Sequence, residues 1–228
     1  DIFFLNAVSL IPILFAYAKM NVNTPVIQET NKKPLHEIRE GISEARKNPI
    51  IFGNLLAAGI VSSLILNMGT YGPLFADRVL HKGLDGFGSI LFAAGAGSMA
   101  SGILSATSST HYSQRFIFTA AGLCGLLLMA VSYIFWTIPA LFMFALLGFA
   151  TILFMVNCNT AIQMASPPEY LGRIMGLYTF VFLGSAPFGS LLVSAIIEYM
   201  GTSLGLAIVG LFEIILILLT AKTYPKQK

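Results

Sequence analysis

The sequence has little charge and little cysteine. Only 10% of its 228 residues are Asp, Glu, Lys or Arg, whereas soluble domains carry about a quarter. Hydrophobic residues make up 56% of the chain, and its mean hydropathy is +0.81. This composition excludes a soluble domain. The two cysteines, Cys124 and Cys158, both fall inside apolar runs, so we expect no disulfide and infer no redox compartment.

Sequence motifs of soluble enzymes are also missing. The chain has no phosphate-binding glycine loop, no HExxH, no CxxC and no nucleophile elbow, so we predict no enzyme. The three histidines, His36, His81 and His111, lie in expected loops without metal-ligand spacing, so we assign no metal and no cofactor. The basic residues follow the ends of apolar runs, and this distribution gives no support for nucleic-acid binding.

What the sequence does have is long stretches without charge. A membrane-spanning helix needs about 20 apolar residues, and these stretches do not alternate as the strands of a membrane barrel would. The fourth stretch is too long for one span and suits two, with a break near 135–139. We therefore predict an all-α polytopic membrane protein with seven transmembrane helices. The stretches are 2–18, 48–76, 86–110, 116–168, 174–197 and 199–221, the last interrupted only by Glu213.

The basic residues divide unevenly between the two expected sides of the membrane. Only Arg78 and Lys82 fall on one side, and the other eleven Lys and Arg residues fall on the opposite side. Cytoplasmic loops are enriched in Lys and Arg, so we expect the loop 20–49 and the C-terminus in the cytoplasm. The chain starts at Asp1, directly before an apolar run and without a basic leader. We interpret it as a piece of a longer protein that lacks its front part.

A short helix is predicted within the long loop. Leu35, Ile38, Ile42 and Ala45 recur at helical spacing between charged residues, and residues 48–49 (Asn-Pro) are typical of a stop. The helix is expected either on the cytoplasmic membrane surface or as a solvated linker between two bundles.

Polar side chains form two arcs on separate expected spans. At 100° per residue, the first set covers about 100° of its helix and the second about 160°. The arcs predict a water-filled, substrate-lined cavity; the alternative is that they only form hydrogen bonds between helices. The first set is Ser63, Asn67, Thr70 and Tyr71, and the second is Asn157, Asn159, Thr160 and Gln163.

Glu213 stands in the middle of the last apolar run. A charge there costs several kcal/mol, so the carboxyl must be protonated, paired or in contact with water. One interpretation is a proton-coupling site; the other is a neutral Glu that is hydrogen-bonded to a neighbouring helix.

Small residues predict close helix packing in two places. The sequence 92–102 (FAAGAGSMASG) offers Ala94, Ser98 and Gly102 at helical spacing. The sequence 184–190 (GSAPFGS) is expected to bend its helix, because proline removes a backbone hydrogen bond. The residues assigned to this bend are Gly184, Pro187 and Gly189.

Residues 166–201, SPPEYLGRIMGLYTFVFLGSAPFGSLLVSAIIEYMG, carry a family resemblance. They resemble the C-terminal half of major facilitator superfamily transporters, in particular the bacterial efflux branch that includes siderophore and macrolide exporters. In that branch a cytoplasmic loop of the type P-x-E-x-x-G-R-x-M-G-L-Y joins the tenth and eleventh helices. The resemblance implies that Glu169 and Arg173 anchor the cytoplasmic ends of these helices and that Gly172 permits the turn.

This chain departs from the family at two positions. Many relatives carry Arg where Leu171 stands, and the loop 105–115 lacks the G-x-x-x-D-R-x-G-R-R signature, so we expect no salt-bridged gate in that loop.

The resemblance also implies a domain arrangement. Residues 1–19 would be the sixth transmembrane helix of the full-length protein, and 20–49 the central cytoplasmic loop. Residues 50–221 would form the C-terminal six-helix bundle, and 222–228 the cytoplasmic tail. The expected partners are the lipid bilayer, a small-molecule substrate and the missing N-terminal half.

The resemblance implies a function. We expect proton-coupled export of a small amphipathic organic compound by alternating access in the bacterial inner membrane. A nutrient uptake permease of the same superfamily and a transport-inactive sensor or truncated product stay open.

Overall fold

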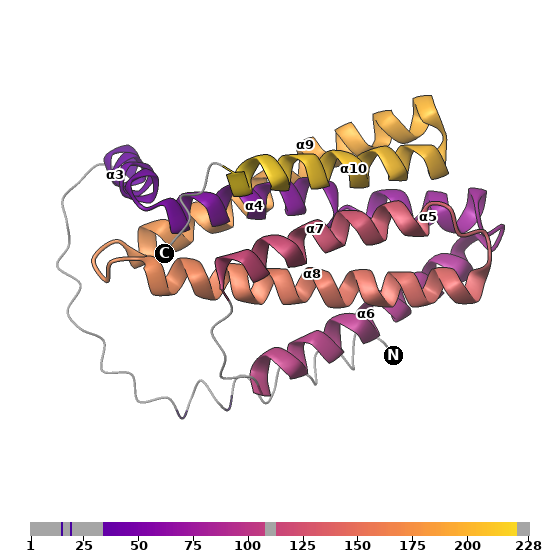
Figure 1. Ribbon diagram of the computed structural model, residues 1–228, viewed down its shortest axis with the longest axis horizontal. Coiled ribbons are helices and arrows are strands. Elements are labelled where there is room, and N and C mark those ends of the chain that lie inside the picture. Colours follow the sequence, from indigo (N-terminus) through magenta and orange to yellow (C-terminus); the bar gives the residue numbers. More distant parts are fainter. Residues whose placement is uncertain (1–14, 16–18, 20–33, 108–112, 223–228) are drawn as a thin grey trace. The chain divides into compact units, whose positions relative to one another are not determined.

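The computed structural model describes residues 34–107 and 113–222, together with Phe15 and Lys19. The chain divides into two units, 1–33 and 34–228, and the helical bundle belongs to the second unit. The predicted first span, 2–18, lies outside the described residues apart from Phe15. All regular structure in the described part of the second unit is helical (Figure 1). The helices are α3 (Pro34–Lys47), α4 (Pro49–Leu64), α5 (Met68–Arg78), α6 (Gly83–Thr107), α7 (Gln114–Val131), α8 (Thr137–Ala165), α9 (Leu171–Met200) and α10 (Thr202–Lys222).

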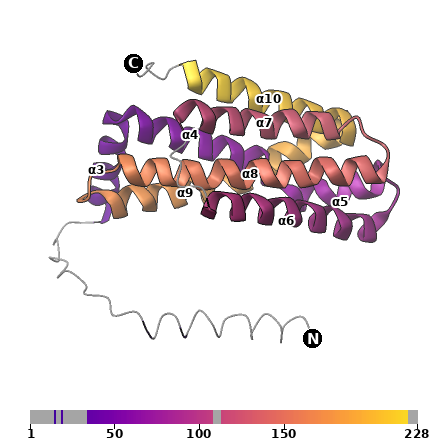
Figure 2. The same ribbon diagram turned by 60° about the horizontal axis from the view of Figure 1, so that its bottom comes forward.

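Six spans within the described ranges are long and apolar enough to cross a membrane, which confirms the all-α polytopic membrane fold. They run side by side in both views of the bundle, and α3 crosses one end of it (Figures 1 and 2). The long apolar stretch 116–168 contains two helices, α7 and α8, as predicted. The break lies at residues 132–136, between the end of α7 and the start of α8.

Capping side chains set the starts of α4 and α7. The side-chain oxygen of Asn48 accepts a hydrogen bond from the Ile50 amide at 3.0 Å, and Pro49 takes the first helical position. The side-chain amide of Asn48 also donates to the Ala165 carbonyl at 3.1 Å. Ser113 caps α7 through the Phe116 amide. Asn48 therefore starts α4 and joins it to the last residue of α8.

The span 49–78 is discontinuous, although the sequence suggests one unbroken helix. It is interrupted at residues 65–67, and the amides of Ile65 and Leu66 both donate to the Val61 carbonyl. The Tyr71 hydroxyl donates to the Ile65 carbonyl at 2.9 Å, and the Asn67 amide donates to the Ser63 carbonyl. Backbone groups within hydrocarbon need internal partners, so these two side chains stabilise the break.

We expect Tyr71→Phe to lower the free energy of unfolding by about 1–3 kcal/mol, because the buried Ile65 carbonyl loses its partner. Tyr133→Phe is the control, since Tyr133 is exposed. Denaturant unfolding in mixed micelles measures both. Equal stability of the two variants would contradict this role of the Tyr71 hydroxyl.

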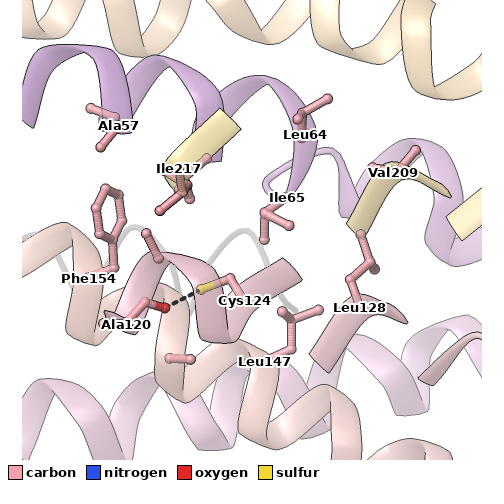
Figure 3. Close-up of a cluster of buried hydrophobic side chains, with 14 of the residues drawn as sticks. Ala57, Leu64, Ile65, Ala120, Cys124, Leu128, Leu147, Phe154, Val209 and Ile217 are labelled. Atoms are coloured by element: carbon pink, nitrogen blue, oxygen red, sulfur yellow. Dashed lines mark hydrogen bonds between the residues drawn. The ribbon is translucent and has the colours of Figure 1, made fainter. Parts of the chain in front are cut away.

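The part of the core that Figure 3 shows lies between α4, α7, α8 and α10, and the buried cluster continues onto α5 and α9. It contains both cysteines, which are free and fully buried. The Cys124 thiol donates to the Ala120 carbonyl at 3.3 Å, and the Cys158 thiol donates to the Asn54 carbonyl at 3.4 Å. Phe75 and Phe144 add an edge-to-face contact with ring centroids 5.4 Å apart. The thiols thus serve as small packing groups.

Small residues bring α6 and α8 close together, as the sequence 92–102 predicts. Ala94 is buried, and the Ser98 hydroxyl donates to the Gly148 carbonyl at 3.3 Å. A Cβ added at Gly102, however, would meet nothing within 4 Å, so the close approach predicted there is wrong. Gly97 takes that role, because a Cβ there would overlap the Ala145 carbonyl. The face of α6 that contains Gly97 and Ala94 is the one that α8 covers.

Candidate functional site

The polar arc of α8 lies along the last three turns of that helix. Thr160 and Gln163 are exposed, and Asn157 and Asn159 are half-buried. Three hydrogen bonds hold these side chains to their own helix. Asn157 donates to the Leu153 carbonyl at 2.7 Å, Thr160 donates to the Val156 carbonyl at 2.8 Å, and Gln163 donates to Asn159. The arc therefore presents polar groups on an open side of the bundle.

The predicted arc of the second span is divided by the break between α4 and α5. Ser63 and Thr70 are half-buried, but Asn67 is 9% exposed and Tyr71 is fully buried. The structure thus places Asn67 and Tyr71 inside the bundle, where they bond to the backbone at the break. Ser63 alone of this set lines a groove on the side of the bundle.

This groove has a volume of about 370 Å³ and lies between α3, α4 and α9. Its walls are apolar except at Arg46, near the α3 end, and Ser63, at the far end. The lining residues are Ile42, Ala45 and Arg46 from α3, Phe52, Leu55, Leu56, Gly59, Ile60 and Ser63 from α4, and Leu177 and Val181 from α9. Such a surface suits an apolar or amphipathic ligand.

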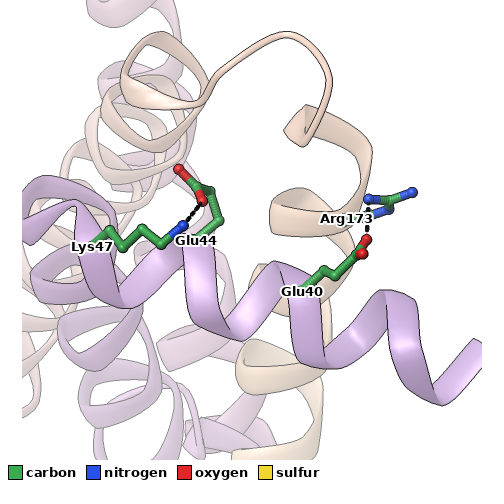
Figure 4. A network of polar contacts seen from close by, with 4 residues as sticks. All are labelled: Glu40, Glu44, Lys47 and Arg173. Atoms are coloured by element: carbon green, nitrogen blue, oxygen red, sulfur yellow. Dashed lines mark hydrogen bonds and ion pairs between the residues drawn. The ribbon is translucent and has the colours of Figure 1, made fainter.

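An ion pair joins α3 to the start of α9. Arg173 donates to the Glu40 carboxylate at 2.8 Å, and its guanidinium lies 5.5 Å from the centre of the Tyr170 ring (Figure 4). Within α3, the Glu44 carboxylate lies 2.8 Å from the Lys47 ammonium, and this hydrogen bond raises the pKa of Lys47. The ion pair between Arg173 and Glu40 therefore holds α3, which forms one wall of the groove, against α9, which forms another.

The other residues assigned to this loop lie apart from the ion pair. Glu169 is exposed and has no hydrogen bond or ion pair within the described ranges. Gly172 lies inside α9 and not in the turn, and it has open space around it. Its predicted role in permitting the turn is therefore wrong. Sequence reasoning missed Glu40 as the partner of Arg173, although Glu40 lies on the predicted helix of the long loop.

The residues assigned to a helix bend lie within one continuous helix. α9 runs through Pro187 to Met200. Gly189 is buried, and a Cβ there would overlap the backbone of Ser63 in α4. Gly184 has no neighbour within 4 Å at its Cβ position. Gly189 thus allows α4 and α9 to approach closely at Ser63, which is the residue at the far end of the groove.

Glu213 lies away from both the groove and the α8 arc. It is fully buried in α10 and faces Gly125 of α7, where a Cβ would overlap its carboxylate. Neither carboxylate oxygen has a hydrogen-bond partner of normal geometry among the residues that the structure describes, and the backbone amide of Gly125 is a nearby donor. No basic residue pairs with it within those ranges. Glu213 is therefore a buried polar group at the contact of α7 with α10.

The six apolar spans define a multi-pass membrane protein, and the comparisons with known proteins name its family. The family model described as Major Facilitator Superfamily matches residues 2–190. The chain therefore belongs to the major facilitator superfamily and is a membrane transporter of that family. No curated protein and no solved structure matches the chain.

Proposed function

We propose that the chain is the C-terminal half of an exporter for a small amphipathic organic compound. Residues 1–19 would be its sixth helix, 20–49 its central loop and 50–221 its second bundle. Alternating access would arise from two bundles that move about a site at their interface, and the driving force would be proton exchange. The missing N-terminal half would complete the pathway.

The observation that carries this proposal is the exposure of Thr160 and Gln163 on an apolar helix. Polar side chains in a spanning segment usually face a bundle interior or a water-filled cavity, because hydrocarbon offers them no partners. Val156 and Met164, which are also exposed on α8, add the apolar surface that an organic substrate needs. Together they support a pathway with apolar walls and a few polar groups.

The excess of basic residues on one side supports a C-terminus in the cytoplasm, and the resemblance to the bacterial efflux branch implies a location in the bacterial inner membrane. In this orientation α3 and the open end of the groove lie at the cytoplasmic surface. Export would then load the substrate from the α3 end.

The test is efflux of a preloaded amphipathic dye from cells that co-express the chain with its upstream coding sequence. We expect the double variant Thr160→Val/Gln163→Leu to lower the efflux rate about tenfold, since lost hydrogen bonds to substrate cost about 1.5 kcal/mol. Thr119→Val is the matched control, because Thr119 is also exposed and bonds to a carbonyl of its own helix, α7. A protonophore should abolish efflux in the parent.

Three other outcomes would contradict the proposal, each at a different point. Dye accumulation instead of loss would identify an uptake permease. No movement of any substrate in either direction would favour a transport-inactive sensor. Equal loss in the double variant and in Thr119→Val would remove the α8 arc from the pathway.

A further inference from the structure

The groove beside α4 runs inward from the membrane surface. Its lining begins on α3, the helix that crosses the end of the bundle, and ends at Ser63. Ser63 lies 14 residues beyond Pro49, the first residue of α4, which corresponds to about 21 Å along the helix axis. One leaflet of a bilayer has a hydrocarbon depth of about 15 Å. The groove thus has the length of one leaflet, headgroup region included.

The only charged side chain in the groove's lining is Arg46, at the α3 end. The nearby carboxylates of Glu40 and Glu44 bind Arg173 and Lys47 instead (Figure 4). Arg46 is exposed and forms no ion pair within the described ranges. A cation at the membrane surface, above an apolar channel of leaflet depth, matches a ligand with an anionic head and an aliphatic tail.

We propose that this groove is a binding site for an anionic phospholipid of the leaflet on the α3 side. One acyl chain lies along Phe52, Leu56 and Ile60 of α4 and Leu177 and Val181 of α9, and its phosphate binds Arg46. The site does not depend on the transported substrate or on the direction of transport. A lipid bound here contacts both α3 and α9, so it adds to the ion pair that joins them.

The apolar walls of the groove and the single basic side chain at its membrane-surface end together favour a lipid as the occupant. Every wall below Arg46 is aliphatic or aromatic until Ser63, so an extended or irregular segment of protein would leave its backbone groups without partners. An acyl chain has no such groups. Basic side chains next to a membrane attract anionic headgroups, each by roughly a fivefold gain in binding.

The test uses fluorescence quenching by brominated lipid. The 228-residue chain has one tryptophan, Trp136, so the double variant Trp136→Phe/Phe52→Trp carries a single reporter in the groove. It is reconstituted into phosphatidylcholine vesicles with rising fractions of either brominated phosphatidylglycerol or brominated phosphatidylcholine. We expect brominated phosphatidylglycerol to quench the reporter as if its fraction beside the groove were about five times its fraction in the bilayer. Arg46→Gln in this background should bring that preference back to about one.

The matched control is Arg39→Gln, since Arg39 is exposed on the same helix but does not line the groove. It should keep the preference. Persistent quenching by brominated phosphatidylcholine in Arg46→Gln shows that the groove is still formed. Three results would overturn the proposal: equal quenching by both lipids in the parent, equal loss in Arg39→Gln and Arg46→Gln, or no quenching of the reporter by either lipid.

Discussion

Gly189→Ala is expected to lower the free energy of unfolding by about 3 kcal/mol, a large effect for one methyl group. The added Cβ would overlap the carbonyl oxygen, carbonyl carbon and Cα of Ser63 in α4. Because the obstacle is backbone, it cannot rotate away, and α9 must move off α4. The same movement would widen the groove between these helices.

Gly184→Ala is the matched control in the same helix. Its Cβ would meet nothing within 4 Å, and alanine favours a helix over glycine by up to about 1 kcal/mol. We therefore expect this variant to be as stable as the parent or more stable. Denaturant unfolding in mixed micelles compares the two. If both variants unfold at the same midpoint, the close contact of α9 with α4 is refuted.

Glu213→Met is expected to raise the free energy of unfolding by about 1–3 kcal/mol. The carboxyl is fully buried at the contact of α10 with α7, and neither oxygen has a hydrogen-bond partner of normal geometry among the described residues. Burying such a group costs free energy, and a flexible apolar side chain of similar length removes that cost. Denaturant unfolding in mixed micelles measures the change. Lower stability of the variant would contradict this account of the site.

Glu213→Gln separates a structural role from proton coupling. It keeps the shape of the side chain but cannot carry a proton on and off. If Glu213 couples transport to protons, efflux by this variant loses its dependence on pH. Unchanged efflux and unchanged pH dependence would discard the coupling hypothesis. Glu198→Gln serves as control, because Glu198 is exposed on α9.

The six described spans could be predicted, because the length of an apolar stretch is enough to identify a membrane-spanning helix. The bilayer fixes how many apolar residues a helix needs, and the interruption at 132–136 follows from a stretch too long for one span. The break at 65–67 could not be predicted. No proline or charge marks it, and it depends on where the Tyr71 hydroxyl and the Asn67 amide reach the backbone.

Contacts between helices were harder to predict than the helices themselves. The chain has 21 glycines, and the sequence does not tell which of them face another helix. Gly97 and Gly189 do, whereas Gly102 and Gly184 do not. Such contacts depend on how helices rotate and pack, which a periodicity in one helix does not specify.

The ion pair of Arg173 shows the same limit for a polar contact. The sequence placed Arg173 at one end of the bundle, but its partner Glu40 comes from a helix 133 residues earlier in the chain. Nothing in the spacing of charges along either helix joins the two residues. Their pairing depends on how α3 crosses the start of α9, which only the packed structure provides.

The central claim is that the exposed side of α8 faces a water-filled transport pathway. The most direct measurement is labelling of Val156→Cys by a membrane-impermeant maleimide, in cells that co-express the upstream coding sequence. Val156 lies nine residues before Ala165, the end of α8, so its depth is about 14 Å. Thiols react as thiolates, which form in water and not in hydrocarbon. The native thiols of Cys124 and Cys158 are buried and give little background.

Leu123→Cys provides the comparison at equal depth, nine residues after Gln114, the start of α7. Both Val156 and Leu123 are exposed, but Leu123 lies on a helix outside the proposed pathway. The account predicts that Val156→Cys is labelled and Leu123→Cys is not. Two variants that are both unlabelled, or both labelled at the same rate, would contradict it.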